Sequence, residues 1–163
     1  MKRIYLSGKL GKGKFVIVDD DMFEYLNRWT WNDDGKGYAY RTQRYGLRKF
    51  NKKKNIRMHR LVLDVPEGLI ADHINGNTLD NRKINLRAAN DQQSAFNTGI
   101  SLKNKSGYKG VGWHGEKKKY RAYIKVGGHQ KHLGYFKIKK EAGIAYNRGA
   151  LKYYGEFARL NII

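Results

Sequence analysis

The pattern of hydrophobic and polar positions in the N-terminal half predicts a buried strand and then a helix. The apolar run at 14–18 is typical of a buried strand. Three aspartates at 19–21 precede an apolar stretch at 22–26, and acidic residues are favoured at the start of a helix. We therefore expect a strand followed by a short helix that begins at the aspartates.

The C-terminal half has a different pattern, which predicts a small sheet followed by a longer helix. Alternating runs at 108–114, 120–126 and 131–136 are separated by Gly and Lys turns, which favours antiparallel strands. From about 139 to 154, small and apolar residues recur at helical spacing. Small residues allow such a helix to lie close against a sheet.

Between these halves lies a polar stretch that an ordinary core would not contain. His73 follows Asp72, which places an imidazole that titrates near neutral pH beside a hard oxygen ligand. The run 75–77 (Asn-Gly-Asn) favours a tight turn with positive φ, and a helix is expected at 91–97 after Asn90 as its N-cap. Taken alone, an Asp-His pair in a polar loop is more often a turn-stabilising hydrogen bond than a catalytic pair.

The spacing of the whole stretch resembles a known family. Its motifs are DHINGN at 72–77, DN at 80–81 and NLR at 85–87, which are similar to those of HNH nucleases of the ββα-metal type, in the phage and intron homing-endonuclease branch. The resemblance implies that His73 is the general base that deprotonates water, that Asp72 is a metal ligand, and that Asn81 braces the turn and orients the site.

One position departs from that family. The branch places a second metal-binding Asn or His on the helix, where this chain has Ser94, with Asn97 one turn later and Asn90 one turn earlier. The resemblance implies a Mg²⁺ or Mn²⁺ ion held by Asp72 together with Asn97 or Ser94. Asn90 stays open as a third candidate.

The charge of the chain points to a polyanionic partner. There are 34 Lys and Arg against 14 Asp and Glu, a formal net charge of +20. The excess is divided: 15 basic against 6 acidic side chains in 1–57, 4 against 5 in 58–100, and 15 against 3 in 101–163. Two basic flanks can bind phosphates while a near-neutral centre holds a cation. In the first flank we expect DNA contacts from Lys52, Lys53 and Lys54, for which a solvated loop is the alternative.

The second flank resembles another family. YKGV at 108–111, HLGYF at 132–136 and the run 141–161 are similar to the Apetala-two/ethylene-response-factor DNA-binding domain, which also occurs attached to phage and bacterial HNH nucleases. The resemblance implies that one sheet face enters the major groove while the helix covers the other face. The matching DNA-contact positions are Trp113, His114, Arg121, Tyr123, Lys125, Lys131 and His132.

The sequence thus predicts an α+β protein in three parts. They are an N-terminal β-rich basic segment (1–57), a ββα-metal nuclease core (58–100), and a basic linker with a three-stranded antiparallel sheet and helix (101–163). The predicted activity is metal-dependent nicking of double-stranded DNA by a monomer or weak dimer.

Other features of the sequence bear on the cellular location of the protein, and two alternative functions stay open. The chain has no cysteine, which excludes disulfides and Cys-ligated zinc. It has no apolar run that would serve as a signal peptide or membrane span, so we expect the cytoplasm of a phage-infected or bacterial cell. The alternatives are a non-cleaving DNA-binding protein with a decayed centre, which Ser94 favours, and an RNA-binding protein attracted by charge alone.

Overall fold

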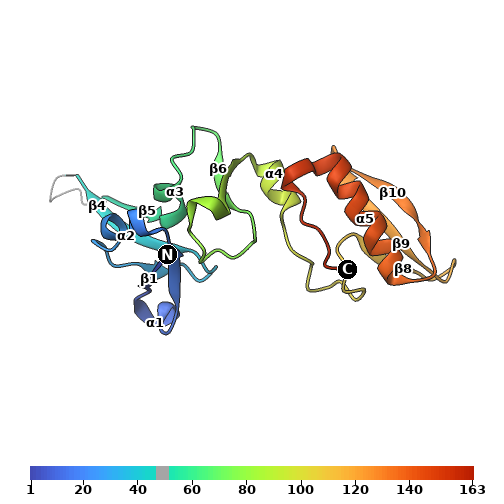
Figure 1. The fold of residues 1–163 in the computed structure, drawn as a ribbon, viewed down its shortest axis with the longest axis horizontal. Helices are drawn as coiled ribbons and strands as arrows, with labels where there is room; N and C mark the ends of the chain where they lie inside the picture. The colour runs from blue at the N-terminus through green and yellow to red at the C-terminus, as the bar shows by residue number, and fades with distance from the viewer. Residues whose placement is uncertain (47–51) are drawn as a thin grey trace. The chain divides into compact units, whose positions relative to one another are not determined.

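A computed structural model gives the fold and describes residues 1–46 and 52–163 (Figure 1). The chain divides into two compact units, Met1–Asp91 and Gln92–Ile163. Each unit combines helices with small sheets whose strand ladders are antiparallel, which confirms the expected mixed α and β composition. The three-part domain division remains a prediction. The basic run at 48–54 is predicted to form a turn or hairpin arm, and its residues 48–51 lie outside the described residues.

The first unit is built from short elements. Its sheets have the strand orders β1-β2, β3-β4-β5 and β6-β7. The elements in chain order are β1 (Lys2–Tyr5), α1 (Gly8–Gly11), β2 (Phe15–Val18), α2 (Asp20–Leu26), β3 (Asn32–Asp33), β4 (Ala39–Tyr45), β5 (Lys52–Arg57), α3 (Met58–Val62), β6 (Ile70–His73), the 3-10 helix η2 (Lys83–Asn85) and β7 (Leu86–Ala89). The strand predicted at 14–18 and the helix predicted after the aspartates are therefore confirmed as β2 and α2.

One hydrophobic core connects the β6-β7 pair to the N-terminal sheets. Trp31 is fully buried at its centre and donates a hydrogen bond from Nε1 to the carbonyl oxygen of Leu26 at 2.8 Å. Met58 from α3 and Leu86 from β7 belong to the same buried cluster as Val16 of β2. The short helix α3, which the pattern did not predict, is therefore held against the core on one side of β6.

The second unit is a three-stranded antiparallel sheet with a helix on one face (Figure 1). The strand order is β10-β9-β8, and the predicted three strands and long helix are confirmed. Its elements are α4 (Asp91–Phe96), which starts at the boundary, β8 (Val111–His114), β9 (Lys119–Val126), β10 (His129–Phe136), α5 (Lys139–Tyr154) and the 3-10 helix η3 (Gly155–Phe157). Gly149 permits close packing of α5, because a Cβ there would lie 2.8 Å from the side chain of Leu133.

The end of α4 is fixed to the second unit by hydrogen bonds and a ring contact. The ammonium group of Lys109 lies 2.6 Å from the carbonyl oxygens of both Phe96 and Thr98. The ring of Phe96 stacks on that of Tyr154, with centroids 3.8 Å apart and planes inclined by 9°. The backbone N–H of Arg159 also donates to the carbonyl oxygen of Phe96. The last turn of α4 is therefore built into the C-terminal fold.

Within the part of the chain that the structure describes, no helix is long and apolar enough to cross a membrane.

Candidate functional site

The β6-β7 hairpin places Asp72 opposite Arg87. The two residues are cross-strand partners, and directly opposed residues have their side chains on the same face. Arg87 donates from Nε and Nη2 to Oδ2 of Asp72, each at 3.1 Å. The two side chains are only 12% and 10% exposed. Asp72 and Arg87 therefore form an ion pair that is largely shielded from water.

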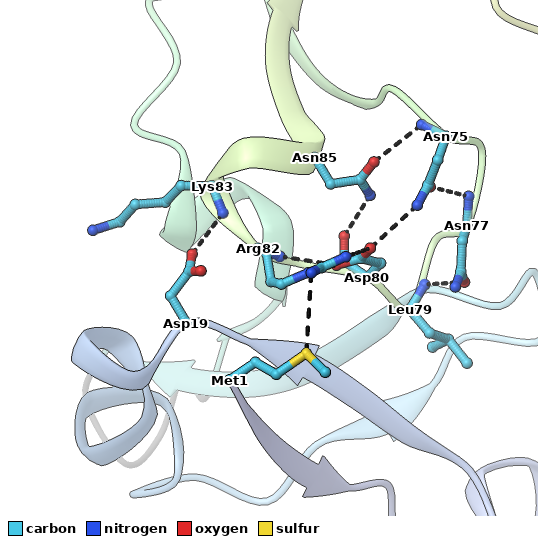
Figure 2. Close-up of polar contacts among 9 residues, drawn as sticks. All are labelled: Met1, Asp19, Asn75, Asn77, Leu79, Asp80, Arg82, Lys83 and Asn85. Atoms are coloured by element: carbon cyan, nitrogen blue, oxygen red, sulfur yellow. Dashed lines mark hydrogen bonds and ion pairs between the residues drawn. The ribbon is translucent and has the colours of Figure 1, made fainter.

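The loop that joins the two strands is held by its own asparagines (Figure 2). Gly76 has a φ of 73°, as expected for the predicted Asn-Gly turn. Oδ1 of Asn75 accepts the N–H of Asn77 at 2.7 Å, and Oδ1 of Asn85 accepts the N–H of Asn75 at 3.0 Å. Nδ2 of Asn85 donates to the carbonyl oxygen of Asp80 at 2.8 Å. These motif asparagines therefore provide hydrogen-bond partners for backbone N–H and carbonyl groups of the loop.

Asp80 is the acidic centre of this loop (Figure 2). Its carboxylate accepts from Nε of Arg82 at 2.7 Å, from Nη2 of Arg82 at 2.6 Å, and from Nδ2 of Asn75 at 3.1 Å. The hydrogen bonds from Arg82 hold the pKa of Asp80 below its usual value. Asp80 is buried, so these hydrogen bonds replace the water that the carboxylate lost on folding.

The loop is also attached to β2 and to the residue that precedes α2. The N–H of Ile17 donates to the carbonyl oxygen of Leu79, and the N–H of Asn81 donates back to Ile17, both at 2.8 Å. Oδ2 of Asp19 accepts the N–H of Lys83 at 2.7 Å (Figure 2). These contacts fix the backbone that carries Asn81.

His73 and Asn81 meet inside the unit. His73 is 4% exposed and Asn81 is 1% exposed. Nε2 of His73 lies 3.2 Å from Oδ1 of Asn81. An amide oxygen only accepts, so Nε2 carries the proton and Nδ1 is the basic nitrogen of the neutral ring. Burial lowers the pKa of His73, which keeps the ring neutral and able to take a proton at neutral pH.

Two further rings pack around His73. The centroid of the His59 ring lies 5.0 Å from that of His73, and the Tyr38 ring lies 5.9 Å from it. Burial, with a smaller contribution from the charge on His73, lowers the pKa of His59 to about 3. His59 is therefore neutral near pH 7, and its burial excludes direct contact with solvent-borne phosphate. No pattern in the sequence pointed to Tyr38, because its contact with His73 is formed only by the fold.

The side chain of Asp72, next to His73 in the sequence, suits a magnesium-like ion in its chemistry, whereas Ser94 and Asn97 belong to the second unit and remain predicted ligands. Such an ion takes oxygen ligands, keeps several waters, and needs only one or two carboxylates. Asp72 supplies a carboxylate, and the hydrogen bonds from Arg87 occupy only part of its capacity as an acceptor. Ser94 lies on α4 and Asn97 directly follows it, where they offer a hydroxyl and an amide oxygen. Among residues 1–46 and 52–163, no cluster of three or more His, Cys, Asp or Glu side chains could hold a metal ion.

On the C-terminal sheet, five of the seven expected DNA-contact residues share one face. Arg121, Tyr123 and Lys125 alternate along β9 with the buried residues Ala122 and Ile124, which face α5. Arg121, Tyr123 and Lys125 therefore lie on the face that α5 does not cover. His132 lies on the same face because it is the cross-strand partner of Tyr123. His114 also lies there, since its ring is 5.2 Å from the ring of Tyr135, which is the cross-strand partner of Arg121. We call His114, Arg121, Tyr123, Lys125 and His132 the open face.

Trp113 and Lys131 lie on the other face of the sheet. Lys131 is the cross-strand partner of the buried Ile124, and its ammonium group lies 5.2 Å from the centre of the Tyr153 ring on α5. Trp113 pairs with Tyr120, which packs against the core under α5. The structure therefore does not bring these two residues together with the open face.

The basic arm lies in the first unit. Lys52, Lys53 and Lys54 are exposed on β5, where Lys53 pairs with Arg44 and Lys54 with Gln43 of β4. The three lysines thus stand on a two-stranded ribbon, and their contact with DNA remains a prediction.

Comparison with known proteins agrees with the motif at this site. Residues 64–95, which span the β6-β7 hairpin and most of α4, match the HNH endonuclease family. An uncharacterized HNH endonuclease of Acanthamoeba polyphaga mimivirus is 30% identical over 155 residues, which cover 94% of this chain and 78% of that protein. Protein 3.8 of Escherichia phage T7 is 30% identical over 95 residues, covering 58% of this chain and 78% of that protein. No solved structure matches the chain significantly.

The mimivirus relative is matched over most of its own length as well as most of this chain, so the similarity is not confined to a short motif. The resemblance of the motifs at 72–87 to HNH endonucleases is thereby confirmed, while the ββα-metal type and the homing-endonuclease branch remain predictions. The chain belongs to the HNH endonuclease family, whose members are DNA-cleaving enzymes.

Proposed function

We propose that this protein is a metal-dependent nicking endonuclease in which His73 is the general base. The observation that carries the proposal is the neutral, buried His73, whose Nε2 lies 3.2 Å from Oδ1 of Asn81 and whose chain neighbour Asp72 is paired with Arg87. A general base must be unprotonated and must keep its orientation, and both conditions are met.

Each side chain has a distinct role in this proposal. Nδ1 of His73 takes a proton from the attacking water, and Asn81 keeps the ring in the tautomer that leaves Nδ1 basic. Asp72, with Asn97 or Ser94, would hold Mg²⁺ or Mn²⁺ in a ββα-metal arrangement. When bound, the ion would stabilise the negative charge that develops on the leaving oxygen. One such site per chain implies a cut in one strand for each turnover, so a double-strand break would need a dimer or a second turnover.

Targeting is assigned to the basic flanks. The open face carries Arg121 and Lys125 beside the aromatic side chain of Tyr123, a combination suited to phosphates and base edges in the major groove. In this proposal the sheet binds DNA as an Apetala-two-like domain does. Lys52, Lys53 and Lys54 make further contacts with the DNA. The proposal includes a homing-type role on double-stranded DNA, which the resemblance of the motifs at 72–87 implies.

The test of the proposal is the conversion of supercoiled DNA that includes the protein's own genomic neighbourhood to nicked circles. We expect nicking with Mg²⁺ or Mn²⁺ and none with EDTA, because the ion supplies the charge stabilisation. Nicking that persists in EDTA would contradict metal dependence. Tight duplex binding without cleavage under either metal would favour the second candidate, a non-cleaving DNA-binding protein. Ser94, in place of the Asn or His of related nucleases, is the feature that favours this candidate.

Removing two charges from the open face should weaken DNA binding. In the double variant Arg121→Gln with Lys125→Gln, we expect the slope of log K against log salt to fall by about 2, since each lost phosphate contact removes about 1. Fluorescence anisotropy on a duplex in EDTA measures both affinity and slope. The matched control is Lys139→Gln with Lys140→Gln, which removes the same charge from exposed positions on α5. An equal loss in the control would show that only total charge matters.

A further inference from the structure

A basic pocket lies in the first unit between β4, β5 and α3. Its volume is about 490 Å³, and its polar lining includes Tyr40, Lys54, Arg57 and Arg60, with the carboxylate of Asp34. Three cationic side chains therefore face one pocket together with one anionic side chain. None of the residues assigned to the nuclease chemistry line it.

The charge inside this pocket is not balanced. Asp34 accepts from Nη2 of Arg57 at 2.9 Å and from the backbone N–H groups of Lys36 and Tyr38 at 2.9 and 3.1 Å. That pair neutralises Arg57. Within the described residues, Lys54 and Arg60 have no carboxylate partner, so two positive charges remain for a ligand. An oxyanion with several acceptor oxygens, such as a phosphodiester, matches this arrangement.

Helix α3 contributes adjacent residues to the pocket and to the packing around His73. Arg60 lines the pocket, while the preceding residue on α3, His59, packs its ring 5.0 Å from that of His73. The guanidinium of Arg57 lies 4.6 Å from the centre of the Tyr38 ring, which in turn contacts His73. Because all these residues belong to one compact unit, the distance from the pocket to the candidate base is set by the fold.

We propose that this pocket binds a backbone phosphate of the DNA substrate close to the phosphodiester that is cut, with Arg60 and Lys54 as its principal ligands. The inference rests on the proposed nuclease function and adds a substrate-binding subsite to it. A phosphate held here fixes the register of the strand beside His73, because backbone contacts position a duplex without reading its sequence. Arg60 is thereby a substrate-positioning residue of the HNH unit.

The test uses full-length protein and a duplex from the nicked region, with affinity measured in EDTA so that nothing is cleaved. For Arg60→Gln, and separately for Lys54→Gln, we expect Kd to rise on the order of 10-fold, because each variant loses one charged hydrogen bond to the DNA. The salt slope should fall by about 1. In Mg²⁺, KM should rise while kcat stays nearly unchanged. The control is Lys12→Gln, an exposed lysine of the same unit.

Kd and slope equal to those of the control in both variants would overturn the proposal. The two variants lie on different elements, so misfolding of one leaves the other to decide. A second arm measures binding of inorganic phosphate to the protein with and without bound duplex. Phosphate binding that is lost in Arg60→Gln and that the duplex displaces supports a site for the strand, whereas phosphate binding there that the duplex does not displace would assign the pocket to free phosphate and overturn the proposal. Since binding is read without metal, absence of nicking would contradict only the nuclease function.

Discussion

Replacing His73 with Ala should lower the rate of metal-dependent nicking by about 10²- to 10⁴-fold, the usual contribution of a general base. Binding of duplex DNA should stay close to wild type, because the His73 side chain is buried and does not belong to either basic surface. The measurement is the initial rate of conversion of supercoiled to nicked circles, with anisotropy on a duplex in EDTA beside it. His129→Ala, which removes an exposed histidine from β10, is the matched control.

The pH dependence of nicking provides a second check on His73. Burial lowers the pKa of His73 below its ordinary value of 6.5, so the ring is already unprotonated at pH 7. The rate should therefore fall on the acid side only below about pH 6.5, and the contribution of His73 should be constant between pH 7 and 8. A His73→Ala variant that nicks at the wild-type rate would remove His73 from the mechanism.

Replacing Asp80 with Ala should destabilise the first unit by about 2–4 kcal/mol, because a buried ion pair loses one partner and Asn75 loses an acceptor. The Arg82 side chain is 34% exposed and can regain water, which keeps the loss below that of a fully buried pair. For a unit of this size the melting temperature should fall by roughly 10 °C or more, measured by thermal or urea unfolding.

The acid side of the same experiment tests the cause of this stabilisation. Arg82 holds the pKa of Asp80 below its ordinary value of 3.8, so its stabilisation is fully present above that pH and is lost as pH falls through the lowered pKa. The variant and wild type should thus converge in stability in strong acid. Asp64→Ala, at an exposed carboxylate, should leave stability nearly unchanged. A melting temperature for Asp80→Ala equal to that of the Asp64→Ala control would show that the loop does not depend on this ion pair.

Local sequence was informative where the site is contiguous. The run 70–89 contains both strands of the hairpin and its loop, so the Asn-Gly pair predicted the turn at Gly76, and the family resemblance implied that Asn81 orients the site. The neighbours Tyr38 and His59 could not be predicted this way. They reach His73 through the packing of β4 and α3 against the core, which no local pattern encodes.

The C-terminal sheet illustrates a second limit. Neighbouring residues on a strand point to opposite faces, so Lys131 and His132, or Trp113 and His114, cannot all contact one groove. Which member of each pair faces away from α5 depends on the pairing with β9, and that register is set by the fold. The alternating pattern predicted the strands, but it could not tell which of two adjacent positions faces away from α5.

The anchoring of α4 has a consequence for building hybrid nucleases with new targets. The sequence alone would suggest a joint in the connector at 98–107. A joint there would leave Phe96 without Tyr154 and the Lys109 ammonium, and would free the carbonyls on either side of Asn97. A hybrid should therefore retain α4 together with Lys109, Tyr154 and the fold that carries them, because α4 also carries the candidate metal ligand Ser94.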